Sequence, residues 1–137
     1  MRRDRAVACL GLCLLAAPVS AEAVVSLGVE GATLDLPPAA LAEIEISESG
    51  GITDVFLRLM PRAAEDLARL SADAAGRTMT LSVCGATLME AVVRDRIGSG
   101  TVYLAGTTMI RAEAMRALWH GRARCDTLGP EVFENGQ

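Results

Sequence analysis

Two of the four cysteines and the one histidine lie outside the apolar N-terminal run, and their types could support covalent chemistry. Cys84 and Cys125 lie 41 positions apart, unlike the Cys-x-x-Cys spacing that is typical of redox-active pairs. In an oxidising compartment we expect one disulfide between them, with two buried free thiols as the alternative. His120 is the only histidine, and a metal site needs several ligands. A Cys–His nucleophile pair is conceivable, so a thiol-active protein that uses Cys84 or Cys125 remains an alternative.

A second group of polar residues could bind an anion. Arg94, Arg96 and Ser99 lie in a loop that also contains glycines, and basic side chains beside such a loop can hold carboxylates or phosphates. A solvated loop fits the same pattern, because no helix is expected to begin there. We treat the three residues as a candidate binding loop.

Three glutamates, Glu43, Glu45 and Glu48, could act as paired carboxylates in acid–base catalysis. Glu43 and Glu45 alternate with isoleucine, which instead indicates the solvated face of a strand, where acids also oppose sheet-to-sheet aggregation. Met115 and Trp119 are expected in the core, with a shallow apolar groove for an extended peptide as the alternative. The sequence therefore predicts no catalytic residues, no cofactor and no metal site.

The composition favours one globular domain. The chain has 137 residues, of which 51% are hydrophobic and only 3% aromatic, so the core must be mainly aliphatic. The formal net charge is −4, and the sequence contains arginine but no lysine. An acidic chain of this kind argues against nucleic acids and anionic membranes as partners.

Residues 1–21 have the pattern of a secretory signal peptide. Basic residues at the start are followed by an apolar run over residues 6–17, and Ala21 offers a cleavage position. The run is shorter than the ~20 residues that a spanning helix needs, so we favour a signal over an uncleaved membrane anchor. We expect a periplasmic mature chain without a membrane span.

The elements that must position these residues follow from hydrophobic periodicity and from turn residues. Strands are predicted over residues 23–29, 32–36, 43–48, 54–60, 78–84, 86–93 and 101–105. One helix is expected to begin at Pro61 and end at Gly76, and another to begin after the N-cap Thr108 and end at Gly121.

The expected fold is an α+β domain in which two helices pack on one face of an antiparallel sheet. Residues 22–51 supply lead-in strands, and residues 52–126 form a β-α-β-β-β-α core in which residues 122–126 could add an edge strand. Residues 127–137 are predicted to be a loosely held tail.

This order of elements resembles the head subdomain of the first periplasmic domain of SecD, a subunit of the SecDF protein-export complex. In that family a strand leads to a helix that ends in a glycine-plus-basic step. A tight hairpin, a glycine-rich loop, a short strand and a threonine-capped helix follow. The matching segments are Val55–Leu59, the helix from Pro61, Gly76-Arg77, Met79–Gly85, Ile97–Gly100, Val102–Gly106, Thr108 and Leu118–Arg122.

The resemblance covers about half of the chain and implies the fold of the SecD head. The sequence has Cys84-Gly85 at a turn where the family usually carries Asp-Gly, and Met89-Glu90-Ala91 where the family has a proline. The proton-coupled motor of the full complex is not expected here, because the sequence shows no transmembrane helices beyond the signal.

We therefore expect an exported, non-enzymatic binding module that contacts polypeptide or another envelope protein. The contact would use an open sheet edge or the face of the sheet opposite the helices. One alternative is the thiol-active envelope protein described above. Another is a structural or inhibitory domain that blocks a second protein.

Overall fold

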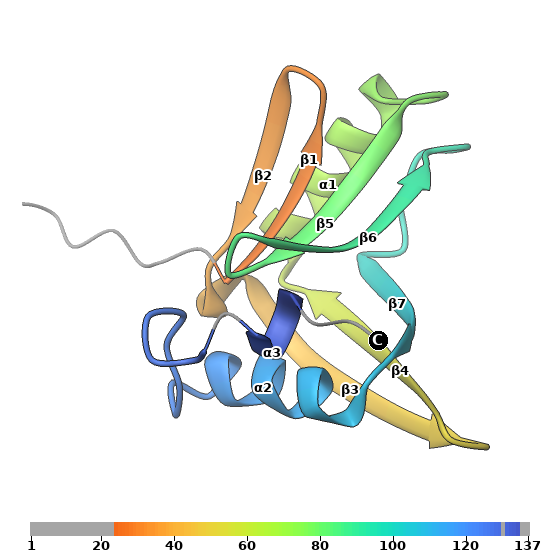
Figure 1. Ribbon diagram of the computed structural model, residues 1–137. Helices are drawn as coiled ribbons and strands as arrows, with labels where there is room; N and C mark the ends of the chain where they lie inside the picture. The colour runs from red at the N-terminus through yellow and green to blue at the C-terminus, as the bar shows by residue number, and fades with distance from the viewer. Residues whose placement is uncertain (1–23, 130, 135–137) are drawn as a thin grey trace, which may run out of the picture.

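The computed structural model describes residues 24–129 and 131–134 (Figure 1). In chain order the elements are β1 (Val25–Val29), β2 (Ala32–Leu36), the 3-10 helix η1 (Pro38–Ala40), β3 (Leu41–Ser49), β4 (Ile52–Leu59), α1 (Pro61–Asp73), β5 (Thr78–Val83), β6 (Ala86–Val92), β7 (Thr101–Thr107), α2 (Met109–Trp119) and α3 (Glu131–Glu134). The signal peptide predicted over residues 1–21 lies outside this part of the chain. Among the described helices, none combines the length and the hydropathy that crossing a bilayer requires.

The α+β class is confirmed, and the strands divide into two antiparallel sheets where the sequence predicted one. The first sheet has the order β2-β1-β5-β6 and the second has the order β3-β4-β7. The division arises because α1 carries the chain away from β4, so that β5 pairs with β1 while β7 returns to pair with β4. The strands before residue 52 therefore contribute to both sheets, and β1 lies in the interior of the first.

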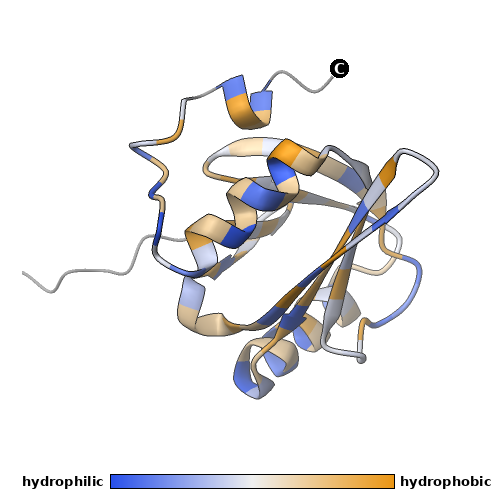
Figure 2. Cartoon of the chain, turned by 90° about the horizontal axis from the view of Figure 1, so that it is seen from below, coloured by the Kyte–Doolittle hydropathy of each residue, from blue (hydrophilic) through white to orange (hydrophobic). Residues whose placement is uncertain are grey.

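One aliphatic core joins both sheets to both longer helices. Along β4 the burial alternates, with Val55 and Leu57 fully buried, as the period of two along a strand requires. Leu67 of α1 and Met115 of α2 enter the same core. Figure 2 shows hydrophobic and hydrophilic residues interleaved along these elements. Both helices thus contribute side chains to one core.

Local signals in the sequence set the ends of the two longer helices. Pro61 occupies the first turn of α1, where a missing N–H costs nothing because that group has no partner within the helix. Thr108 caps α2, and its Oγ1 accepts a hydrogen bond from the Arg111 N–H at 3.2 Å. Both starts agree with the sequence prediction.

The edge strand predicted over residues 122–126 is wrong. These residues form turns and coil, because the backbone of Arg124 is bonded locally. Its N–H donates to Thr127 Oγ1 at 3.1 Å, and its carbonyl accepts from the Thr127 hydroxyl at 2.9 Å. Backbone groups that are satisfied within a turn cannot also form a strand ladder.

The segment predicted as a loose tail includes the short helix α3. Phe133 in α3 is 3% exposed and belongs to the core, and its carbonyl accepts a hydrogen bond from Arg111 Nη2 at 2.9 Å. α3 packs against α2 and β6. One aromatic side chain therefore holds a polar segment against the domain.

Candidate functional site

An apolar cleft of about 350 Å³ lies between the two sheets. It is bordered by the end of β6, the start of β7 and the loop that joins these two strands. Its floor consists of Leu27, Leu67, Met79 and Leu81. Met89 and Val92 of β6 form one wall, and Val102 and Tyr103 of β7 form another. The cleft thus draws on β1, α1 and β5 as well as on the two strands at its mouth.

Both strands at the mouth are edge strands. β6 pairs with β5 and β7 pairs with β4, and neither has a second neighbour among the described strands. Each therefore keeps a row of backbone N–H and C=O groups that no strand uses. Apolar side chains at the mouth are exposed as well, with Val92 at 59% and Tyr103 at 47%. The cleft offers both apolar contact and backbone hydrogen bonds.

The loop that joins β6 to β7 is fixed to α1. The Ile97 N–H donates to Ser71 Oγ at 2.8 Å, and Ser71 is fully buried. Gly100 has a φ of +71°, and a Cβ at this position would lie 3.1 Å from Ala64 Cβ. Only glycine accepts that backbone conformation and that approach without strain. One wall of the cleft is therefore held in place by a helix.

The candidate binding loop lies at the cleft, but only one of its three predicted residues lines the cleft. Arg94 lines the cleft beside Asp95, whereas Arg96 and Ser99 do not. Ser99 Oγ accepts a hydrogen bond from the Thr101 N–H at 3.3 Å and so shapes the loop itself. Within the described part of the chain, Arg94 and Arg96 make no hydrogen bond or ion pair. An anion site in this loop stays a prediction.

Tyr103 marks the point where the cleft meets the outer face of the second sheet. Its ring stacks on Phe56, with ring centroids 4.8 Å apart. A hydrogen bond with the Asp54 side chain, followed by partial desolvation, raises the pKa of the Tyr103 phenol above its usual value of 10.0. Asp54 also accepts a hydrogen bond from the Gly106 N–H at 2.9 Å. The phenol is therefore protonated at neutral pH and is held by its neighbours.

The predicted disulfide between Cys84 and Cys125 is present, with Cα atoms 5.3 Å apart. Cys84 and Gly85 form the turn between β5 and β6 with φ values of +49° and +81°, as a tight hairpin of this type requires. Cys84 is the only described residue other than glycine with a positive φ. The described cysteines thus offer no free thiol.

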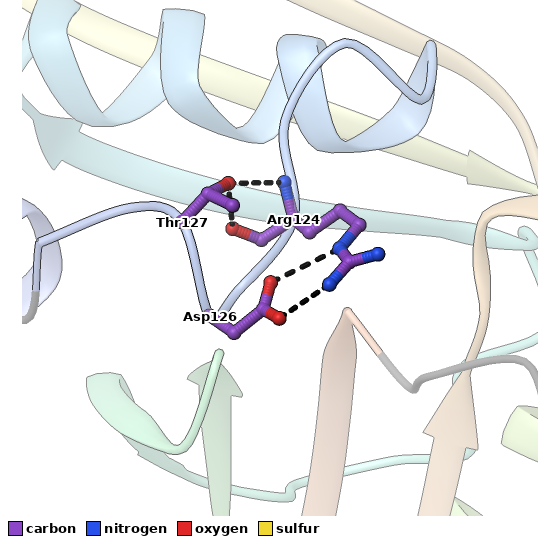
Figure 3. Close-up of polar contacts among 3 residues, drawn as sticks. All are labelled: Arg124, Asp126 and Thr127. Carbon is purple, nitrogen blue, oxygen red and sulfur yellow. Dashed lines mark hydrogen bonds and ion pairs between the residues drawn. The ribbon is translucent and has the colours of Figure 1, made fainter.

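The turn that presents Cys125 is closed by its neighbours (Figure 3). Arg124 Nε donates to Asp126 Oδ1 at 3.0 Å, and Arg124 Nη2 donates to Asp126 Oδ2. This bonding with Arg124 lowers the pKa of the Asp126 carboxyl below its usual value of 3.8. Together with the Thr127 hydroxyl, these contacts bracket Cys125 on both sides.

The glutamates lie on the solvated strand face that the sequence favoured, and the histidine lies at the end of a helix. Glu43, Glu45 and Glu48 are exposed on β3, and Glu43 forms an ion pair with Arg58 on β4. His120 is the C-cap residue of α2. Among the residues that the structure describes, no group of three or more His, Cys, Asp and Glu side chains could hold a metal ion.

The groove considered at Met115 and Trp119 is not formed by these two residues. Met115 is 1% exposed. Trp119 is half-buried, and its Nε1–H donates to the Leu41 carbonyl at 3.1 Å. Both side chains fix α2 against the core and β3.

Sequence reasoning missed the walls of the cleft. A signal was present in Val92 and Val93, because adjacent strand residues point to opposite faces and both cannot enter one core. Val93 is buried and Val92 is exposed. The other wall, on β7, could not be found in this way, because its approach to β6 depends on the tertiary fold.

Comparison with known proteins places this architecture. No protein-family model matches the sequence, and a search of curated proteins found no match. A solved structure described as "Structure and function of a membrane component SecDF that enhances protein export" is similar with a TM-score of 0.53 and 21% identity, covering 61% of this chain and 39% of that chain. "Crystal structure of SecDF in Super-membrane-facing form" is similar with a TM-score of 0.52 and 22% identity, covering 61% of this chain and 12% of that chain.

This chain therefore spans well under two thirds of either SecDF chain. The resemblance seen in the sequence is confirmed at the level of the fold: the chain has an α+β fold that also occurs in SecDF.

Proposed function

We propose that this protein is an exported, non-enzymatic binding module that holds an extended, apolar segment of polypeptide in the cleft between β6 and β7. The observation that carries the proposal is an apolar floor bordered by two edge strands with unused backbone groups. An extended peptide can add itself to such an edge by main-chain hydrogen bonds.

The geometry suits a peptide better than a compact polar ligand. In a peptide that pairs with β6 or β7, alternate side chains point to one side. Those side chains would reach Leu67 and Leu81, which are buried at the floor. Burying aliphatic side chains there is favourable by roughly 25 cal/mol for each Å² of apolar surface removed from water.

The mouth of the cleft adds a polar contact. Arg94 lines the cleft and has no described partner, so its guanidinium is free to donate to a peptide carbonyl or carboxylate. Asp95 beside it could accept from a peptide N–H. These two groups would orient the chain, while the apolar floor would supply most of the affinity.

Export and protein transport are the setting that the other observations support. The pattern over residues 1–21 is that of a secretory signal, which implies a periplasmic location. The similar SecDF structure is described as a membrane component that enhances protein export. A shared fold supports polypeptide as the ligand class, and we propose the exported polypeptide or an envelope protein as its source.

The first experiment measures binding of a fluorescein-labelled decapeptide of alternating valine and threonine by fluorescence anisotropy. Val92→Arg places a charge in the mouth of the cleft, and we expect it to weaken binding at least about tenfold, since burying a charge beside apolar groups is costly. Ile52→Arg is the matched control, because Ile52 is 57% exposed against 59% for Val92 and does not line the cleft. The control should bind as the unaltered protein does.

A second probe separates backbone pairing from apolar contact. The same decapeptide with N-methyl groups on alternate residues cannot donate along one edge, so its affinity should fall if β6 or β7 pairs with the peptide. Equal weakening by Val92→Arg and Ile52→Arg, or no binding of the parent peptide at millimolar concentration, would contradict the proposal. An interaction with a folded envelope protein instead would favour an inhibitory domain.

A further inference from the structure

The few aromatic residues of this chain are unusually placed. The sequence has one Trp, one Tyr and two Phe, and the core is built almost entirely from aliphatic side chains. Phe56 and Tyr103 nevertheless stack on each other outside the core, and Tyr103 is 47% exposed. Aromatic residues are large apolar side chains that favour burial in cores or interfaces. A stacked pair of a half-buried Phe56 and an exposed Tyr103 in so aromatic-poor a chain points to an interface.

The pair lies on the face of the second sheet that is turned away from the core. Phe56 is paired in register with Glu45 on β3 and with Tyr103 on β7, so these three residues form one row across the sheet. The adjacent row contains Glu43, Arg58 and Thr101. A hollow of about 210 Å³ lies between the rows and is lined by both glutamates, Phe56, Arg58 and Thr101. Phe56, one member of the aromatic pair, therefore borders a concave surface.

The charges on this face are predominantly negative. The two rows and the neighbouring Asp54 contribute three carboxylates, those of Glu43, Glu45 and Asp54, against the single guanidinium of Arg58. Glu43 is paired with Arg58, and Asp54 is bonded to the Gly106 N–H. Glu45 is exposed and has no described partner. One uncompensated carboxylate thus lies in the same row as the aromatic pair, next to Phe56.

We propose that this face binds a basic segment of a partner polypeptide, with an arginine or lysine side chain over the Phe56–Tyr103 pair and its charge beside Glu45. A cation over an aromatic ring is attracted by the negative face of the π-system. Arginine fits best, because its planar guanidinium can stack on a ring while it also donates to a carboxylate. The three carboxylates on this face outnumber the single guanidinium of Arg58, so the face has an excess of negative charge that complements a cationic ligand.

This site goes beyond the proposed function and does not depend on it. Phe56, Glu43 and Glu45 do not line the cleft, whereas Tyr103 and Thr101 line the cleft and also belong to this face. An apolar peptide in the cleft and a basic segment on the outer face can therefore be tested separately. One polypeptide that carries a basic residue next to an apolar stretch could engage both.

The test uses an acetylated and amidated Ser-Arg repeat decapeptide as the probe. Its matched control replaces each arginine with citrulline, which keeps the shape of the side chain and removes the charge. Tyr103 is the only tyrosine, so its ring resonances belong to one known residue. Because Tyr103 also lines the cleft, the variants at Phe56 and Glu45, which lie outside the cleft, assign a shift to the outer face. We expect these resonances to shift during titration with the arginine peptide and to stay unchanged with the citrulline peptide.

Two variants assign the contribution of each group. Phe56→Leu should weaken the arginine peptide about twofold to fivefold by removing a ring face, and Glu45→Gln should weaken it by a similar factor by removing the free carboxylate. Glu90→Gln is the control for net charge, because Glu90 is also exposed but lies on β6 of the other sheet. The alternating valine–threonine peptide should bind all three variants equally.

Several outcomes would overturn this inference. Equal binding of the citrulline peptide would remove the role of charge, and equal weakening by Glu45→Gln and Glu90→Gln would leave only a general attraction between opposite net charges. If the Tyr103 resonances shifted with a neutral oligosaccharide but not with the arginine peptide, the aromatic pair would be assigned to sugar binding. Loss of the apolar peptide alone would leave this site intact and refute only the cleft.

Discussion

Strand β6 has two contrasting ends, and each borders a hollow. At the Ala86 end, the hollow is lined by Cys84 and Cys125 and by Phe133 from α3, so the C-terminal segment covers the strand. At the Val92 end, the cleft between the sheets stays open and Val92 is 59% exposed. The chain therefore closes one end with a covalent bond and an aromatic anchor. Within the described part of the chain, the C-terminal segment packs on the Ala86 end of β6 and leaves the Val92 end open.

The largest expected effect comes from the closed end. The double variant Cys84→Ala with Cys125→Ala removes a link across 41 residues, and the entropy of the unfolded chain then rises enough to lower the free energy of unfolding by about 4 kcal/mol. Urea unfolding followed by circular dichroism measures this loss. The folded fraction should still bind the valine–threonine peptide with unchanged affinity. Weaker binding by the folded variant would show that the two ends of β6 are coupled.

A matched pair of truncations compares the two ends directly. Phe133→Ala removes a core side chain that is 3% exposed, so we expect a loss of about 3 kcal/mol in the free energy of unfolding. Val92→Ala removes an exposed side chain and should cost less than about 0.5 kcal/mol while weakening the apolar peptide. If Val92→Ala were as destabilising as Phe133→Ala, the open end would be part of the core and the contrast would fail.

The contrast also explains what the sequence could predict. Helix starts at Pro61 and after Thr108 were found, because a proline at N1 and a threonine cap act through neighbours only a few positions away. The Cys84–Cys125 pair was found because the other two cysteines, Cys9 and Cys13, lie within the predicted signal peptide and leave one possible pairing. Features of this kind depend on residues a few positions apart or on a choice with one possible pairing.

Long-range features were not predictable in the same way. The division into two sheets depends on which strand pairs with β5, and the hydrophobic pattern of a strand alone does not specify its pairing partner. Phe133 was not predicted as a core residue, because one aromatic residue in a polar, glycine-containing tail produces no periodic pattern. The cleft is lined by Val92 of β6 together with Tyr103 of β7, so neither strand reveals it alone.

A smaller effect is expected at the loop that joins β6 to β7 and lines the cleft. Ser71→Ala leaves the Ile97 N–H without its partner, and an unsatisfied polar group at a part-buried site costs about 1–2 kcal/mol. The loss should be concentrated in the loop, so hydrogen exchange at the Ile97 amide should speed up more than exchange in β1. Ser47→Ala is the exposed control, because Ser47 lies on β3 outside this loop, and it should leave that amide protected. Uniform acceleration throughout the chain would instead show that Ser71 supports the whole core.

The smallest effect belongs to the turn that presents Cys125, and it has a definite pH dependence. The contact with Arg124 lowers the folded-state pKa of Asp126 below its usual value of 3.8. The stabilisation is therefore fully present above that value and is lost as the pH falls through the lower, folded-state pKa. The difference in urea midpoint between the unaltered protein and Asp126→Asn should be small at pH 6 and should shrink toward pH 2. Asp35→Asn, also on an exposed site, provides the comparison, and a difference for Asp126→Asn that stayed constant across this range would mean that its ion pair with Arg124 does not stabilise the turn.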